Sequence, residues 1–121
     1  MTDDKRTAGA AGALPPSEIH ALGATVEIAP GAIVSRTLMR SAGGNVTVFA
    51  FDAGQALTEH SAPFDALVHL LDGELVVIIA GEDHPLSPGE AIVMPADVPH
   101  AVRAPAPAKW MLVMLKTPEG G

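Results

Sequence analysis

Histidines are the residues of this sequence whose side chains could do the most varied chemistry, and the sequence contains no cysteine. Thiolate catalysis, disulfide bonds and cysteine-bound zinc are therefore excluded. Five histidines stand among the 121 residues, and an imidazole can transfer protons near neutral pH or bind a divalent transition metal. Which of these histidines act together depends on the fold that the rest of the sequence specifies.

Short strands must position these residues, because the composition favours turns over long helices. Apolar residues make up 48% of the chain and aromatic residues only 3%, so aliphatic side chains would fill most of a core. Eleven prolines and twelve glycines fit short strands joined by tight turns. Apolar runs that indicate strands occupy residues 32–40, 46–51, 67–71, 74–80, 90–94, 98–102 and 109–116.

Turn signals separate these runs, and the clearest is the pair Asp72-Gly73, which is typical of a β-hairpin. Many short strands with such turns predict an all-β fold, either an antiparallel sandwich or a single barrel. A chain of 121 residues suits one domain. We expect residues 1–18 to form a flexible N-terminal leader that ends after two prolines, and residues 19–121 to form the barrel domain.

The stretch from Gly54 to Gly73 resembles the first of two motifs of the cupin superfamily. The family pattern is a Gly, five residues, His-x-His, three or four residues, Glu, six residues and Gly. His60 follows Gly54 at this spacing, whereas Ala62 stands at the second His and Ala66 at the Glu. Gly73 closes the motif with every gap correct.

The second motif of the family is Gly, five residues, Pro-x-Gly, two residues, His, three residues and Asn. In this chain it reads Gly89, Pro95, Asp97, His100 and Ala104, and fifteen residues separate the two motifs, as in small microbial cupins. The chain therefore resembles a small single-domain cupin of the cupin-2 conserved-barrel type. That resemblance implies a single antiparallel β-barrel, the jelly-roll-like double-stranded β-helix.

The resemblance further implies that the His, His, Glu and His positions point into the barrel and bind a divalent metal where all are present. Imidazole and carboxylate ligands suit Fe, Mn, Ni, Cu or Zn. This chain keeps His60 and His100 at those positions, and two imidazoles make a poor metal cage, so loss of the metal is favoured. A reduced metal site could still form if Glu59 or Asp65 turned inward, or if a ligand molecule supplied the remaining donors, although strand alternation places both carboxylates on the opposite face.

Other candidate residues have less specific surroundings. His69 lies three residues from Ala66, so alternation predicts that it faces outward from the barrel. His84 is expected in a surface turn, and nothing around His20 indicates a role. Trp110 can be a pocket wall or an interface anchor, and the sequence leaves that choice open.

His60 and His100 come from two motifs that converge in the cupin fold, so we expect them to line one cavity. They can act there as ligands, as acid and base, or as neutral walls that form hydrogen bonds. The favoured function is binding of a small organic ligand in the barrel interior, which alanine at positions 62 and 66 would enlarge.

Two enzymatic alternatives stay open, and neither assigns a catalytic residue. The first, implied by the resemblance, is a metal-dependent oxygenase, isomerase or decarboxylase that uses a reduced site around the two histidines. The second is a metal-free acid–base enzyme of the sugar-epimerase type. It ranks last because the chain has no tyrosine to act as an acid or base. Only Arg36, Arg40 and Arg103 are plausible cations of the barrel.

Charge and hydropathy restrict the partners and the location. The net charge of −7 and the lack of a basic stripe argue against nucleic acid and anionic membranes. Apolar runs stay far below the roughly 20 residues of a membrane span, and no signal peptide is recognised, so a cytoplasmic location is expected. The resemblance implies a homodimer, in which a partner subunit would cover apolar outer surface such as that of residues 75–80.

Overall fold

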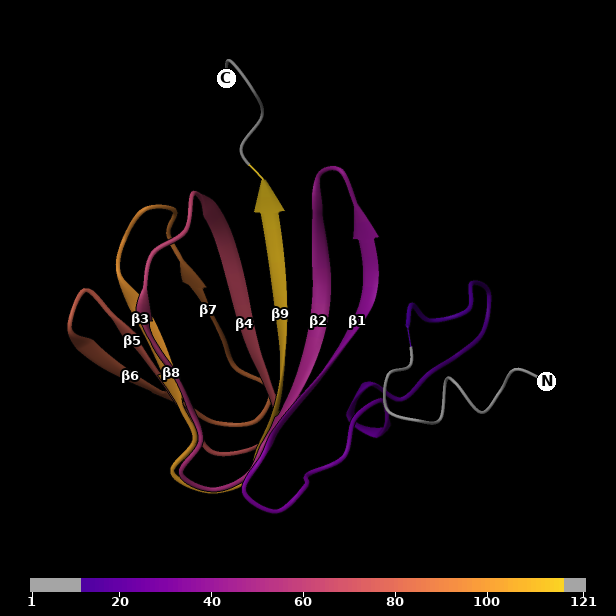
Figure 1. Ribbon diagram of the computed structural model, residues 1–121, viewed down its shortest axis with the longest axis horizontal. Helices are drawn as coiled ribbons and strands as arrows, with labels where there is room; N and C mark the ends of the chain where they lie inside the picture. The colour runs from indigo at the N-terminus through magenta and orange to yellow at the C-terminus, as the bar shows by residue number, and fades with distance from the viewer. Residues whose placement is uncertain (1–11, 117–121) are drawn as a thin grey trace.

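The computed structural model describes residues 12–116, in which the regular secondary structure is almost entirely β-strand (Figure 1). The elements are the 3-10 turn η2 (Leu22–Ala24), β1 (Ile33–Ser41), β2 (Gly44–Phe51), β3 (Ala56–His60), β4 (Phe64–Gly73), β5 (Leu75–Ile79), β6 (Glu82–Leu86), β7 (Ala91–Met94), β8 (His100–Arg103) and β9 (Ala108–Lys116). Within this range, no helix has the length and hydropathy needed to cross a bilayer. The expected all-β class is confirmed.

The strands form two antiparallel sheets that enclose one interior (Figure 1). The five-stranded sheet has the order β1-β2-β9-β4-β7, and the four-stranded sheet has the order β3-β8-β5-β6. Neighbours in these orders are mostly distant in sequence, as in β2 beside β9 and β3 beside β8. This arrangement confirms the jelly-roll-like barrel.

The interior is filled from alternate positions of both sheets, because successive side chains of a strand point to opposite faces. In β9, Trp110, Leu112 and Met114 belong to or pack against the interior cluster. The Trp110 ring stacks on Phe49 with centroids 4.5 Å apart and meets Phe51 edge-on at 5.3 Å. Trp110 is therefore a fully buried core residue, which answers the question that the sequence left open.

One strand differs from the sequence expectation. Residues 82–86, where His84 was expected in a surface turn, form the edge strand β6. The turn itself lies at Ala80 and Gly81, whose φ angles are 51° and 84°. Pro85 is typical of a turn, so the sequence pattern did not indicate a strand here. An edge strand nevertheless tolerates a proline, because one side of its backbone has no strand partner.

A second apolar cluster lies on the outer face of the five-stranded sheet, where the chain before β1 packs. Its buried members are Val26, Leu38, Val48 and Ala50. Leu14 packs against this cluster, and its N–H donates a hydrogen bond to the Leu38 carbonyl over 2.9 Å. Of the expected leader, residues 1–11 lie outside the described range, whereas Leu14 takes part in this packing.

Replacing Gly73 by alanine should destabilise the fold more than the same change at Gly89. The two glycines have nearly equal φ angles, 91° and 92°, so the backbone strain of an alanine is similar at both. A Cβ at Gly73 would collide with the Pro107 carbonyl oxygen, whereas a Cβ at Gly89 meets no atom within 4 Å. Gly73→Ala should therefore cost about 2 kcal/mol more in urea unfolding than Gly89→Ala, and equal losses would contradict this account.

Asp97 replaces the glycine of the second motif yet keeps its left-handed conformation, with φ at 66°. Aspartate tolerates that region better than most residues but less well than glycine. We expect Asp97→Gly to raise the free energy of unfolding by about 0.5–1 kcal/mol. The matched change Ala96→Gly, at a residue without a positive φ, should lower it by a similar amount, and chemical denaturation of both variants tests the difference.

Asp52 links the end of β2 to the segment before β1. The Gly31 N–H donates to Oδ2 over 2.6 Å and the Ala53 N–H donates to Oδ1 over 2.9 Å. These hydrogen bonds, chiefly that from Gly31, hold the pKa of the Asp52 carboxyl below its ordinary value.

The stabilisation from Asp52 is therefore present above the ordinary carboxyl pKa of about 3.9 and is lost as the pH falls through the lower folded-state pKa. Thermal unfolding from neutral pH to about pH 3 should show the wild-type advantage over Asp52→Asn shrinking toward acid. A constant difference in Tm between the wild type and Asp52→Asn across that range would show that ionised Asp52 does not stabilise the fold.

Candidate functional site

Two histidines from distant parts of the chain lie side by side in the four-stranded sheet. His60 ends β3 and His100 begins β8, and their Cα atoms are register partners. Their rings meet edge-to-face, with centroids 4.4 Å apart and planes at 72°. The structure thus brings together the two histidines that the motifs single out.

The pair lies where the apolar interior reaches solvent. His100 is only 5% exposed, whereas His60 is exposed. Two residues beyond His100, Val102 belongs to the interior cluster, so alternation directs His100 to the same side. Ile79, the register partner of His100 on β5, also packs against that cluster.

Each imidazole is fixed by a hydrogen bond to its own strand. Nδ1 of His60 lies 2.8 Å from the Thr58 carbonyl oxygen, and Nδ1 of His100 lies 3.0 Å from that of Val98. Because a carbonyl can only accept, each Nδ1 must carry the proton and donate it. In the neutral ring, Nε2 then keeps its lone pair and is free to face a ligand.

Alanine occupies the two positions at which the cupin pattern has further metal ligands. Ala66 is 6% exposed in the interior cluster and is the register partner of Met94 on β7. Ala62 accepts a backbone hydrogen bond of 2.7 Å from Asp97 N–H, which ties together the loops before β4 and β8. A methyl group at either position donates no electron pair to a metal.

Carboxylates do not replace the missing ligands. Asp65 alternates with the interior residue Ala66, and its Oδ1 accepts a hydrogen bond of 2.9 Å from Ala96 N–H. Across residues 12–116, no group of three His, Asp or Glu side chains is placed to hold a metal ion. The residues present therefore do not fit a metal held by the protein alone, since such sites use at least three protein ligands.

The other three histidines lie outside the strands that carry the pair. His69 is in register with Met111, which packs on the outer cluster, so it faces outward as alternation predicts. His84 lies on β6 opposite Val77. His20 precedes η2, and its Nε2 is buried without a hydrogen-bond partner.

Sequence reasoning missed the role of Asp97, whose backbone N–H joins the two loops beside the pair. Its signal was present in the motif, because an aspartate at a glycine position predicts a left-handed residue in a tight loop. The anchoring of Nδ1 in both histidines had no sequence signal, since each acceptor is a backbone carbonyl.

Comparison with known proteins places this geometry in a family. The model of the cupin domain matches residues 47–114. A conserved protein of unknown function from Streptococcus pyogenes is 34% identical, with a TM-score of 0.82, and the match covers 87% of this chain and 92% of that one. A cupin 2 conserved barrel domain protein from Leptotrichia buccalis is 38% identical, with a TM-score of 0.76, over 78% of this chain and 46% of that one.

A cupin superfamily protein from Desulfitobacterium hafniense shares the fold, with a TM-score of 0.81 and 24% identity over 86% of this chain and 95% of that one. Among curated proteins, none matches significantly. The matching family model covers more than half of the sequence, including His60, His100 and the three motif glycines Gly54, Gly73 and Gly89. This chain therefore belongs to the cupin family.

Proposed function

We propose that this cupin domain binds a small organic ligand whose polar group, a carboxyl or hydroxyl, faces His60 and His100. The observation that carries the proposal is the arrangement of the two imidazoles. Both hold their Nδ1 protons against backbone carbonyls, which leaves both Nε2 atoms for a ligand. Their ring centroids are 4.4 Å apart, so one small polar group can reach both rings.

The apolar residues beside the pair support an organic ligand with an apolar body. Ile79 is in register with His100, and it packs against the interior cluster that contains Ala66 and Met94. Ligand-binding sites commonly combine apolar walls with a few placed polar groups. A bound carboxylic acid could pass its proton to an Nε2 atom, leaving a carboxylate beside an imidazolium, which is a strong charge-assisted pair.

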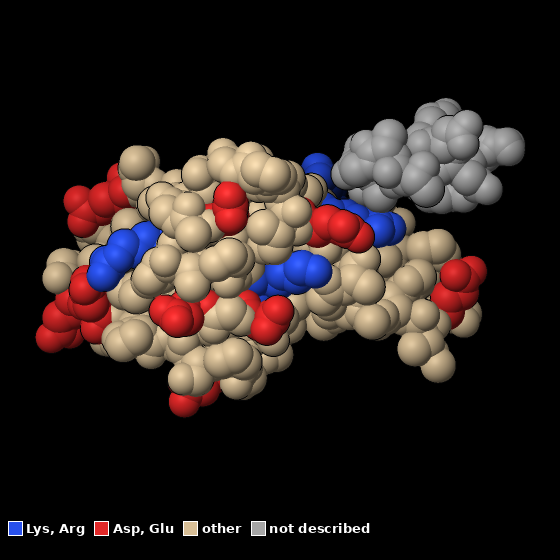
Figure 2. Space-filling view, turned by 90° about the horizontal axis from the view of Figure 1, so that it is seen from below, with Lys and Arg blue, Asp and Glu red and all other residues tan. Residues whose placement is uncertain are grey.

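The charge distribution supports a small ligand over a nucleic acid. On the face seen in Figure 2, Lys and Arg side chains form small groups among Asp, Glu and uncharged residues, and no continuous basic surface is visible. The net charge of −7 also argues against a nucleic acid, because it would repel the phosphates. A cytoplasmic location stays a prediction from the sequence.

A metal-dependent enzyme is the second candidate, and the same hydrogen bonds favour it. Metal-binding histidines usually donate their other ring N–H to a carbonyl or carboxylate, as His60 and His100 do here. This candidate still needs ligands that the described residues do not supply. It therefore ranks below binding of an organic molecule.

Titration with benzoate, monitored through the imidazole 15N signals, tests the first proposal. We expect the signals of His60 and His100 to shift, and those of His69 and His84 to stay in place. Either His60→Ala or His100→Ala should weaken benzoate binding about 10- to 100-fold, the loss expected for one hydrogen bond to a charged group. The matched variant His84→Ala should bind as the wild type does.

Equal effects of all three variants, or shifts spread over all histidines, would contradict a site at the pair.

Metal analysis after incubation with Fe, Mn, Ni, Cu or Zn separates the two candidates. One equivalent of metal that survives dialysis and is lost in both His60→Ala and His100→Ala would replace the first proposal by the second.

A further inference from the structure

Across the five-stranded sheet, one row of inward-facing side chains connects the barrel interior to the end of the β1–β2 hairpin. Register partners in antiparallel strands lie on the same face of a sheet. Successive register partners from β1 to β7 give the row Arg40, Asn45, Met114, Ala66 and Met94. The last three of these belong to the interior cluster or pack against it. The arginine and the asparagine therefore share the inner face of the sheet with the barrel core.

The four-stranded sheet carries a matching row that contains the histidine pair. In strand order, its members are His60, His100, Ile79 and Glu82. The connections 61–63 and 95–99 link the strands of the two rows, β3 to β4 and β7 to β8. Figure 1 shows the β1–β2 hairpin, the end of β9 and the β3–β4 connection at the same end of the barrel. The two rows, which we call the rim rows, therefore border the same end of the interior.

Of the three arginines that the sequence offered as barrel cations, Arg40 is the one on the inner face. Arg36 is in register with Val48 of the outer cluster, and Arg103 faces outward because it follows the inward Val102. Within residues 12–116, the Arg40 guanidinium has no hydrogen-bond or ion-pair partner. Its N–H groups are therefore left to donate to a ligand.

Two threonines fix the orientation of the Asn45 amide next to Arg40. Thr47, which is only 9% exposed, donates a hydrogen bond from its hydroxyl to Asn45 Oδ1 over 3.4 Å. Thr47 then accepts from the Thr37 hydroxyl, whose oxygen lies 3.1 Å away. Because Oδ1 faces Thr47, the Nδ2 group of Asn45 is the part of the amide left to donate. Arg40 and Asn45 thus both present donors, which suits an anionic oxygen group.

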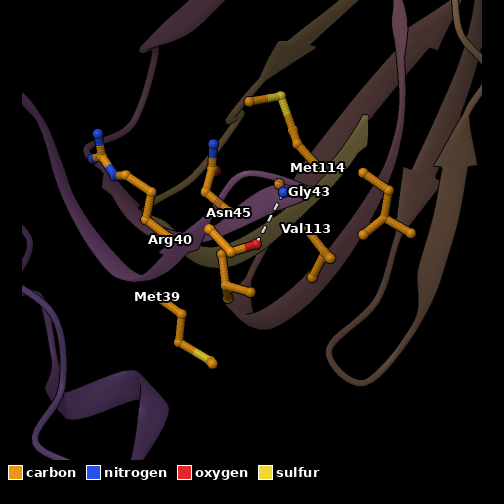
Figure 3. A pocket seen from close by; sticks show the side chains of 10 residues that line it. Met39, Arg40, Gly43, Asn45, Val113 and Met114 are labelled. Carbon is orange, nitrogen blue, oxygen red and sulfur yellow. Dashed lines mark hydrogen bonds between the residues drawn. The ribbon is translucent and has the colours of Figure 1, made fainter. Parts of the chain in front are cut away.

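A hollow of about 310 Å³ lies where the β1–β2 hairpin meets the end of β9. Figure 3 shows Arg40, Asn45 and Met114 on one side of the strand ends, and Met39 and Val113 on the other. On the first side, two polar side chains stand beside an apolar one. That combination suits an acidic group at the end of a carbon chain.

We propose that the ligand of this domain is a small dicarboxylic acid, with one carboxyl group at His60 and His100 and the other at Arg40 and Asn45. The inference rests on the proposed binding at the histidine pair and identifies the other end of the ligand. Facing sheets lie about 10 Å apart, so a flexible chain of a few carbons reaches from one rim row to the other. Met114 and the interior cluster provide apolar contacts for that chain.

The charges of the rim rows favour an anion at the β1–β2 corner. Glu82 is the one acidic member of the two rows, and it lies on β6, which Figure 1 shows on the opposite side of the barrel from β1 and β2. Since the chain has a net charge of −7, a second carboxylate is repelled unless specific donors receive it. A preference for a dicarboxylate over a monocarboxylate is therefore diagnostic of the Arg40 corner.

Calorimetric titration of the full chain with adipate and hexanoate, at neutral pH and constant ionic strength, tests the proposal. The two acids have the same carbon chain and differ in one terminal carboxyl group. Adipate should bind about 10- to 100-fold more tightly, the gain expected for hydrogen bonds to a charged group. Arg40→Gln should reduce the affinity for adipate to that for hexanoate, and Asn45→Ala should remove part of the gain.

Arg36→Gln is the matched control, because it removes the same charge from the outer face of the same strand. It should keep the preference for adipate, and circular dichroism should report the same β structure for all variants. Hexanoate binding without a preference for adipate would overturn this inference and leave the proposed function standing. A preference that Arg40→Gln leaves intact, or that Arg36→Gln reduces equally, would overturn it as well. If neither acid binds, this inference and the proposed function both fail.

Discussion

The central strand β9 carries apolar side chains on both faces, and the arrangement of the molecule depends on this constraint. Trp110, Leu112 and Met114 face the barrel interior, whereas Met111 and Val113 face outward. A strand of this kind must be covered twice, because apolar surface left in water costs about 25 cal/mol per Å². The four-stranded sheet provides one cover, and the segment before β1 provides part of the other.

The outer cover reaches only one end of β9. Leu14, Leu22, Val26 and Ile28 pack on the cluster that includes Met111, and Lys109 donates a hydrogen bond of 2.7 Å to the Gly23 carbonyl. Further along β9, Val113 lies on the outer face in register with Leu67, and Met39 and Val93 at the two edges of that face are exposed. The same alternation that builds the interior thus leaves an apolar surface on the outside.

The sequence predicted the fold well because turns and alternation are local signals. Gly54, Gly73 and Gly89 all have positive φ angles, as the motif spacing indicates. The apolar runs did not indicate β3, because its polar end, Glu59 and His60, lacks an apolar pattern, although the metal-site argument already treated Glu59 as a strand residue. Its pairing with β8 connects residues about forty positions apart, and no local signal encodes that contact.

The candidate site was predictable in its members but not in its geometry. Spacing within two motifs singled out His60 and His100, and their register pairing accounts for the meeting of the rings. The outward position of Asp65 followed from alternation, whereas its hydrogen bond to Ala96 depends on a loop 31 residues away. Such side-chain-to-backbone contacts become visible only when the loops are placed.

The hydrogen bonds of the two histidines explain how both rings keep a fixed orientation although alanine occupies the other two ligand positions of the motif. A buried polar atom without a partner costs about 1–3 kcal/mol, so an imidazole in an apolar barrel normally needs both nitrogens satisfied. His100 meets half of that need within its own chain, through the Val98 carbonyl, and His60 does the same through Thr58. The orientation of each ring is therefore fixed by a hydrogen bond within the chain itself, through Nδ1 and a backbone carbonyl.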